Sequence, residues 1–180
     1  MNKNIKLTLV ELNLGDILLR PWQEGDEEGL VNHGNNYQIW KNVRDRFPHP
    51  YTMEDARIWV QIANQDPMAI NLAIVVEEEV VGAVGVIFKD DVYRRSAEIG
   101  YWLGEAYWRQ GITTRAVQAL SDYVLEHFDI CRLYAGVFDY NKASSRVLEK
   151  TGYHFEARLR QSVTKEGRTG DELIYARLVE

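Results

Sequence analysis

The order of apolar and polar positions along the chain predicts an α/β fold. Short runs rich in β-branched residues are typical of strands, and apolar residues that recur three or four positions apart indicate helices. Strands are predicted at residues 16–20, 72–76, 80–88, 96–103, 133–138, 153–163 and 172–179. Helices are predicted at 53–65, 112–127 and 143–151, with one or two broken helices between 26 and 40.

Two pairs of neighbouring strands are expected to form hairpins, which would make the sheet largely antiparallel. They are 72–76 with 80–88, and 153–163 with 172–179. Thr52, with Asp55 three positions later, predicts a capping box at the start of the helix at 53–65. Gly152 predicts a left-handed end for the helix at 143–151. We therefore expect a mostly antiparallel central sheet flanked by helices.

The size and composition of the chain suit one globular domain. It has 180 residues, of which 46% are hydrophobic and 27% are charged. A chain of this length can bury one core of useful size. No repeat or low-complexity stretch divides it, so residues 1–180 are predicted to form a single domain.

Several cellular and chemical classes are disfavoured by the same sequence. The opening MNKNIKLTLVELNL alternates polar and apolar residues, whereas a signal peptide has a continuous apolar block. No apolar run approaches the roughly 18 residues of a membrane-spanning helix. Cys131 is the single cysteine, and the four histidines show no metal-ligand spacing. We expect a cytoplasmic protein without a membrane segment, an internal disulfide or a metal.

The charge is unevenly divided along the chain. The formal net charge is -6, which disfavours nucleic acid or an anionic membrane as the main partner. Residues 1–100 carry 10 basic and 16 acidic side chains, whereas residues 101–180 carry 11 of each. The C-terminal part is therefore the better place for an anionic ligand, and the N-terminal part suits a cationic one. A solvated acidic face is the alternative interpretation.

The segment EIGYWLGEAYWRQGITTRA, residues 98–116, contains the most informative pattern. A predicted strand leads into a turn with Gly104 and Gly111, and the turn opens a helix. The start of such a helix has unpaired backbone N–H groups and the positive end of the helix dipole, which suit a phosphate. The chain contains no GxGxxG and no Gly-Lys-Ser/Thr, which disfavours the dinucleotide-binding and P-loop classes. A purely structural role for the glycines remains an alternative.

Three motifs resemble the Gcn5-related N-acetyltransferases. Residues 108–116, WRQGITTRA, resemble the pyrophosphate-binding signature of that family, and residues 141–153, NKASSRVLEKTGY, resemble its second motif. A weaker match is LRPW at 19–22. The resemblance covers about residues 16–178 and is greatest to the branch that acetylates the N-termini of ribosomal proteins. Trp108 and Thr113 depart from the usual first motif, and Thr113 narrows the access of a phosphate to the backbone.

The resemblance implies that acetyl-CoA binds where the strand at 96–103 separates from the strand at 133–138. The implied cofactor contacts are Trp102, Leu103, Arg109, Gln110, Gly111, Ile112, Thr113, Thr114, Asn141 and Arg146. Arg115 is a further candidate for a phosphate contact. Asn141 has an alternative role as the N-cap of the following helix, and each arginine has one as a solvated charge.

The resemblance also suggests how an acetyl group reaches an amine. A protonated amine must lose a proton before it attacks a thioester, and Glu98 is the candidate base. An ion pair between Glu98 and Arg94 or Arg95 is the structural alternative. Ser144 is the candidate that orients or protonates the leaving sulfur, and a backbone hydrogen bond is its alternative role. The acceptor groove is expected at Trp40, Arg44, Asp45, Phe47 and Tyr51.

The predicted function is therefore an acetyl-CoA-dependent N-acetyltransferase that acts on a primary amine in a ternary complex, as a monomer or homodimer. A protein or peptide N-terminus is one acceptor. A polyamine or aminoglycoside is another, and a noncatalytic acyl-CoA-binding module is the rival from a different functional class.

Overall fold

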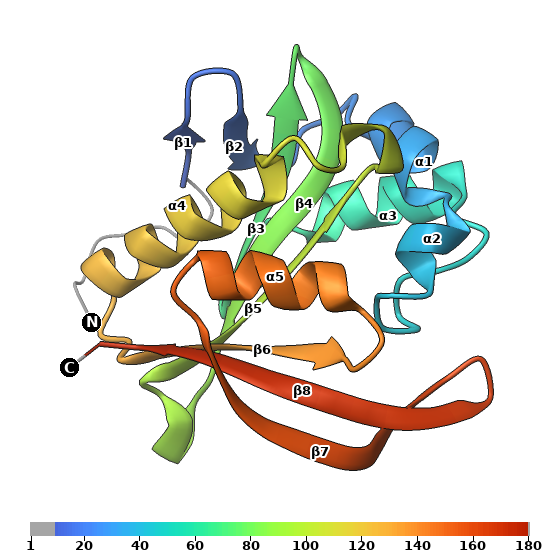
Figure 1. Ribbon diagram of the computed structural model, residues 1–180. Coiled ribbons are helices and arrows are strands. Elements are labelled where there is room, and N and C mark those ends of the chain that lie inside the picture. The colour runs from blue at the N-terminus through green and yellow to red at the C-terminus, as the bar shows by residue number, and fades with distance from the viewer. Residues whose placement is uncertain (1–9, 180) are drawn as a thin grey trace.

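A single eight-stranded sheet runs through the molecule (Figure 1). The computed structural model describes residues 10–179, with the strands in the order β1-β2-β3-β4-β5-β6-β8-β7. All neighbouring strands are antiparallel except β5 and β6. The strands are β1 Leu12–Asn13, β2 Leu18–Pro21, β3 Ala69–Val76, β4 Glu79–Phe88, β5 Ser96–Leu103, β6 Arg132–Phe138, β7 His154–Lys165 and β8 Arg168–Leu178.

Helices cover both faces of the sheet. α4 and α5 lie on one face, and α1, α2 and α3 lie on the side of the opposite face (Figure 1). The helices are α1 Glu27–Gly34, α2 Tyr37–Trp40, α3 Met53–Ile62, α4 Ile112–His127 and α5 Lys142–Lys150, with short 3-10 turns η2 Asp91–Tyr93 and η3 Glu105–Tyr107. The predicted fold class is confirmed.

Most local signals in the sequence have the expected outcome. Thr52 accepts a hydrogen bond from the backbone of Asp55, whose carboxylate accepts one in return, so the capping box at α3 is present. Gly152 has a φ of 81° just after α5. The last hairpin extends further than predicted, because Glu166 and Gly167 form its turn with φ values of 51° and 71°.

Two hydrophobic clusters lie on the two sides of the sheet. The larger is made by α4, α5 and the facing side chains of β2–β6 and β8, including Ile74, Ile99 and Leu120. The smaller contains Leu30 of α1 and Ala56 of α3 with side chains from the opposite face of β3 and β4. Four of the helices, α1, α3, α4 and α5, therefore bury apolar side chains against a defined face of the sheet.

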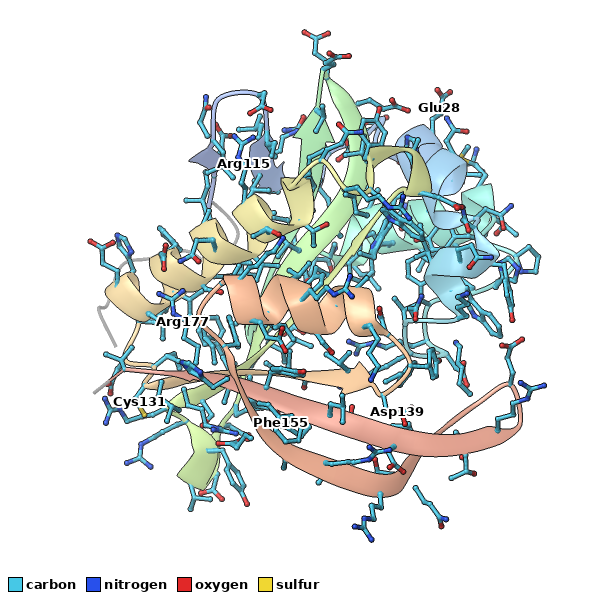
Figure 2. All side chains as sticks on the ribbon, in the orientation of Figure 1. Glu28, Arg115, Cys131, Asp139, Phe155 and Arg177 are labelled. Atoms are coloured by element: carbon cyan, nitrogen blue, oxygen red, sulfur yellow. The ribbon has the colours of Figure 1, made fainter. Side chains whose placement is uncertain are left out.

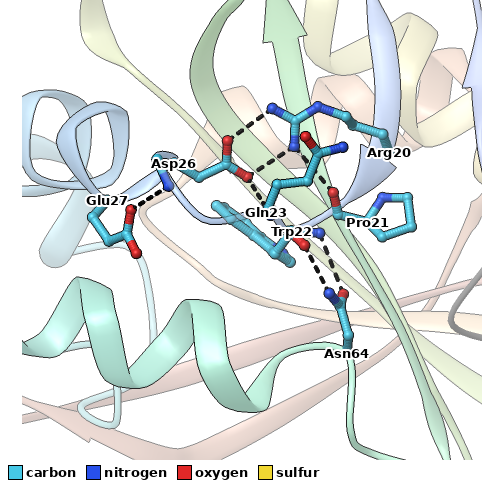
Figure 3. A network of polar contacts seen from close by, with 8 residues as sticks. Arg20, Pro21, Trp22, Gln23, Asp26, Glu27 and Asn64 are labelled. Atoms are coloured by element: carbon cyan, nitrogen blue, oxygen red, sulfur yellow. Dashed lines mark hydrogen bonds and ion pairs between the residues drawn. The ribbon is translucent and has the colours of Figure 1, made fainter.

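The LRPW motif at residues 19–22 has a structural role (Figure 3). Arg20 donates two hydrogen bonds to Asp26, at 2.8 and 2.7 Å, and both side chains are nearly buried. Trp22 exchanges backbone hydrogen bonds with the side-chain amide of Asn64. These contacts connect β2 to the start of α1 and to the end of α3, so the motif holds the α1–α3 layer on the sheet.

The prediction that the opening segment is not a signal peptide falls partly on residues 1–9, which lie outside the described residues. No described helix is long and apolar enough to cross a membrane.

We predict that Asp26→Ala lowers the free energy of unfolding by about 3 kcal/mol, because it leaves Arg20 buried without its partner. Urea denaturation measures this change. As a control, Glu54→Ala removes an ion pair to Arg57 that is 3.8 Å long and exposed on both sides, so it changes stability by less than about 1 kcal/mol. Equal effects of the two substitutions would contradict the role of the Arg20–Asp26 pair.

Candidate active site

The sheet opens between β5 and β6. Within residues 10–179 these strands form the one parallel pair, which extends from Ser96 opposite Arg132 to Glu98 opposite Tyr134. Beyond this point β5 remains paired only with β4, and β6 remains paired only with β8. The opening belongs to a cavity of about 1460 Å³. Ligand sites commonly measure roughly 300–1,000 Å³, so this cleft has room for a large cofactor and a second substrate.

Backbone groups of β5 are left free along the opening. The N–H of Gly104 donates to the carbonyl of Val81 at 2.7 Å, which sets the hydrogen-bonding order between β5 and β4. Alternate residues of an antiparallel strand bond to the same neighbour. The backbone of Trp102 therefore faces β4, and the N–H groups of Tyr101 and Leu103 face the opening. Of the two predicted backbone contacts for the cofactor, Leu103 has this geometry and Trp102 does not.

The turn before α4 leaves the first backbone N–H groups of the helix without a side-chain cap. Arg109 and Gly111 have φ values of 64° and 79°, and no side chain caps the helix where it starts at Ile112. The first N–H groups of a helix have no partner within it and carry the positive end of the helix dipole. Here they belong to residues 112–114, and all three of these residues line the cleft.

Two predicted cofactor residues of this segment have other roles. The side chain of Ile112 is buried in the larger cluster, so only its backbone N–H is available to a ligand. Gln110 is absent from the cleft wall, and its amide donates to the carbonyl of Ala106 at 3.2 Å. The hydrogen-bond donors of this turn are therefore mainly backbone groups, and Gly111 adds no side chain beside them.

α5 adds positive charge to the opposite wall. Lys142, Arg146 and Lys150 are four residues apart along the helix, and all three line the cleft. Asn141 also lines it, while its side chain caps α5 by accepting from the N–H of Ser144 at 3.2 Å. Of these three cations only Arg146 was predicted to contact the cofactor, although their i, i+4 spacing is visible in the sequence.

Arg115 is directed elsewhere. Its guanidinium donates to Asp16 at 2.6 Å and to the carbonyl of Leu14. It lies beside β1 and β2 (Figure 2), so it is held away from the cleft and does not meet the expected phosphate.

Glu98 and Tyr101 point to opposite faces of the sheet. Successive side chains of a strand alternate, and these two residues are three positions apart. Tyr101 packs against the cluster under α4 and α5, whereas Trp102 packs against the cluster under α1 and α3. Glu98 shares the face of Trp102. Because both Glu98 and Tyr101 line the same cavity, the cleft passes through the opening in the sheet.

The carboxylate of Glu98 is occupied by two cations. Lys89 donates to one oxygen at 2.9 Å, and Arg44 donates to the other. Burial raises the pKa of Glu98, but the interactions with Lys89 and Arg44 outweigh it and lower the pKa below its usual value. A carboxylate of lowered pKa is a weak base. The geometry therefore disagrees with the expected role of Glu98 as the base, and its partners also differ from the expected Arg94 or Arg95.

Ser144 lies in the first turn of α5 and contacts β5. Its hydroxyl is 2.8 Å from the hydroxyl of Tyr101, which also donates to the carbonyl of Ser144 at 3.2 Å. Both residues line the cleft. Burial raises the pKa of the Tyr101 phenol, and the contact with Ser144 reduces this shift only in part. Tyr101 is therefore a neutral hydrogen-bond donor at the place expected for the reacting sulfur.

The predicted acceptor loop is divided between the cleft and its surroundings. Arg44 and Phe47 line the cleft, and the ring of Phe47 packs 5.6 Å from that of Trp102. Tyr51 is buried in the smaller cluster, where burial raises its pKa to about 12. It belongs to the core and not to the groove, because its ring packs beneath Phe47 at 4.8 Å.

The other two predicted acceptor residues hold the loop to the last hairpin. Asp45 lies 2.6 Å from the ammonium group of Lys165, which is buried and sits 3.7 Å above the ring of Trp40. Neither Trp40 nor Asp45 lines the main cleft. They position the wall that carries Arg44 and Phe47.

Besides Lys142 and Lys150, three residues at the site were not predicted from the sequence: Tyr101, Lys89 and Glu172. Glu172 of β8 lines the cleft, and its carboxylate lies over Gly136, where an added Cβ would be 2.2 Å from the oxygen. Gly136 alternates with buried Ala135 and Val137, so Glu172 is on the face of Glu98. No sequence signal indicated Lys89 or Glu172.

An opened sheet with a free helix start on one side, and a space lined by aromatic and charged side chains on the other, suits an enzyme that brings a large anionic cofactor to a second substrate. The comparisons with known proteins agree. The family model of the acetyltransferase (GNAT) domain matches residues 16–154. The probable N-acetyltransferase YjcK of Bacillus subtilis (strain 168) is 34% identical over 167 residues, with 89% of this chain and 92% of that protein covered.

Further relatives have the same activity in their names. The ribosomal-protein-serine acetyltransferase of Escherichia coli (strain K12) is 29% identical over 130 residues, with 71% of this chain and 72% of that protein covered. The chain belongs to the GNAT acetyltransferase family and is an acetyl-CoA-dependent N-acetyltransferase.

Solved structures share the fold. RimL, a ribosomal L7/L12 α-N-protein acetyltransferase in complex with coenzyme A, has a TM-score of 0.84 at 24% identity, with 94% of this chain and 98% of that chain covered. The microcin C7 self-immunity acetyltransferase MccE, in complex with acetyl-CoA and AMP, has a TM-score of 0.84 at 24% identity, with 98% and 100% covered.

We predict that Lys89→Met raises the pKa of Glu98, because burial then opposes ionisation with one cation fewer. NMR titration of the Glu98 carboxyl carbon measures the shift, and Arg95→Met is the control because Arg95 pairs with Asp129 instead. In the wild type the lowered pKa stabilises the fold above pH about 4.5, and this contribution is lost as the pH falls through the lowered pKa. An unchanged pKa in Lys89→Met would contradict the assigned ion pair.

Proposed function

We propose that this enzyme transfers the acetyl group of acetyl-CoA directly to a primary amine while both are bound. The observation that carries the proposal is the cleft that passes through the sheet at the end of the β5–β6 pairing. Its two sides have different chemistry. Free N–H groups and the cations of α5 lie on the α4–α5 side. Aromatic side chains, Glu172 and the ion pair of Glu98 with Arg44 lie on the α1–α3 side.

The α4–α5 side suits the phosphates of acetyl-CoA. The pyrophosphate would accept from the backbone N–H groups of residues 112–114 beside Gly111, and Arg146 would meet the remaining phosphate with Lys142 and Lys150 close by. The amide arm would follow the free N–H groups of β5. This brings the thioester to Tyr101 and Ser144. The RimL and MccE structures, solved with coenzyme A and acetyl-CoA, support the choice of cofactor.

The chemistry needs few side chains. The neutral amine attacks the thioester carbon, so an N–C bond forms and, as the intermediate collapses, the C–S bond breaks with its electron pair on sulfur. A free N–H of β5 stabilises the carbonyl oxygen as it gains negative charge. Ser144 donates a hydrogen bond to the leaving sulfur. The amine proton passes to water, and Glu98 holds Lys89 and Arg44 in place at the acceptor side.

A protein or peptide N-terminus is the acceptor that we favour. The relative from Escherichia coli is named for a ribosomal-protein serine, and RimL for an α-N-protein substrate. The acceptor side carries the carboxylate of Glu172, which suits an ammonium group, and the aromatic rings of Phe47 and Trp102. A small amine is the second candidate, because MccE has a similar fold and its structure contains AMP.

We predict that Gly111→Glu weakens the binding of CoA more than tenfold, because it places a bulky negative charge against the phosphates. Isothermal titration calorimetry measures the affinity. Gly111→Ala is the matched control: it has the same unfavourable positive φ, but its Cβ meets no atom within 4 Å, so it retains most of the affinity. Undiminished binding by Gly111→Glu would place the cofactor elsewhere.

The acceptor is identified by a screen with acetyl-CoA in which released thiol is measured. The panel contains short peptides with serine or alanine N-termini, the same peptides with blocked N-termini, spermidine and kanamycin. We expect turnover with free N-termini only, and a decrease of about tenfold or more in Ser144→Ala. Turnover with spermidine or kanamycin would select the small-amine alternative. Tight CoA binding with no turnover on any member would support a noncatalytic acyl-CoA-binding module.

A further inference from the structure

The contact between Tyr101 and Ser144 is a built feature of the cleft. A serine in the first turn of a helix commonly bonds to a nearby backbone group. In this chain the side-chain cap of α5 is supplied by Asn141, which accepts from the N–H of Ser144. The hydroxyl of Ser144 is thus left for another partner. That partner is the phenol of Tyr101, at 2.8 Å across 43 residues of sequence.

The environment of Tyr101 makes it a hydrogen-bond donor. Its ring packs against the larger hydrophobic cluster, and its hydroxyl is directed to α5. Burial raises the pKa of the phenol, so it remains protonated at neutral pH. A hydroxyl has one hydrogen and two acceptor positions. The one hydrogen of Tyr101 reaches two acceptors on Ser144, the hydroxyl oxygen at 2.8 Å and the carbonyl oxygen at 3.2 Å. When Tyr101 shares its hydrogen between these two oxygens, the Ser144 hydrogen is free to point into the cleft.

We propose that Tyr101 is a positioning residue, which holds the Ser144 hydroxyl as a donor to the sulfur of coenzyme A. This assignment rests on the proposed function. The sulfur gains negative charge when the C–S bond breaks, and a correctly oriented O–H stabilises the thiolate. A donor that is itself polarised by a second hydrogen bond is a stronger donor. Tyr101 acts through Ser144 and transfers no proton itself.

The chain contains a matched control for this contact. Tyr153 and Ser121 form a second tyrosine–serine hydrogen bond, also 2.8 Å long and buried. Neither residue lines the cleft. Burial raises the pKa of Tyr153 to about 12, so it too is a neutral phenol. Tyr153→Phe therefore removes the same kind of contact at a place where it cannot affect a bound thiol.

The experiment compares CoA with desulfo-CoA, in which hydrogen replaces the thiol group. Calorimetric affinities for both ligands are measured from pH 6 to 9.5, and their ratio removes protein titrations common to both complexes. In the wild type we expect CoA to gain affinity over desulfo-CoA as the thiol ionises near pH about 8.5, by analogy with cysteine. In Tyr101→Phe the affinity ratio of CoA to desulfo-CoA at high pH should be about tenfold smaller than in the wild type, because a hydrogen bond to a charged group contributes a free energy of this size.

The variants separate the possible outcomes. Tyr153→Phe should keep the wild-type ratio, and adding Tyr101→Phe to Ser144→Ala should cause no further loss. If Tyr101→Phe fails to fold, the NMR signal of the Tyr101 Cζ atom in the wild type provides the test: it should shift more with CoA than with desulfo-CoA at high pH, and equal shifts with both ligands would overturn the proposal. A wild-type ratio in Tyr101→Phe, or equal losses in Tyr101→Phe and Tyr153→Phe, would overturn the proposal. Failure of the wild type to bind either ligand would overturn the proposed function as well.

Discussion

The site depends on a parallel strand pairing that ends after three positions. β5 and β6 pair from Ser96 to Glu98, and each strand then stays with its other neighbour. Backbone donors in a sheet are normally used by the adjacent strand. Because the pairing ends here, the inner edge of β5 keeps free N–H groups in a cleft. The start of α4 adds further donors, so the chain can bind a polar cofactor with few dedicated side chains.

The alternation of side chains along β5 divides the chemistry between two faces. Tyr101 contacts Ser144 on the side of α4 and α5, and Glu98 contacts Lys89 and Arg44 on the other side. In the proposed complex the first pair, which is neutral, lies near the leaving sulfur. The second group, which is ionic, lies near the acceptor.

The sequence predicted the parts of this arrangement that have a local origin. The bounds of β5 and α4, and the cap at Thr52, follow from periodicity and capping chemistry within a few residues. The start of β8 was predicted four residues too late, at 172 instead of 168, because the first residues of that strand include no buried apolar position. Contacts between distant segments were not predictable: the partners of Glu98, and the burial of Tyr51 beneath Phe47, depend on how the loop packs on the sheet.

The central claim is that the opening beside β5 and the start of α4 together hold the cofactor. An amide NMR titration with CoA tests it most directly, because each N–H group reports its own hydrogen bond. The account predicts large shifts for the N–H groups of Thr113, Thr114 and Leu103, and small ones for Trp102, whose backbone is paired with β4. Saturable binding of CoA that leaves the signals of residues 112–114 unchanged would contradict it.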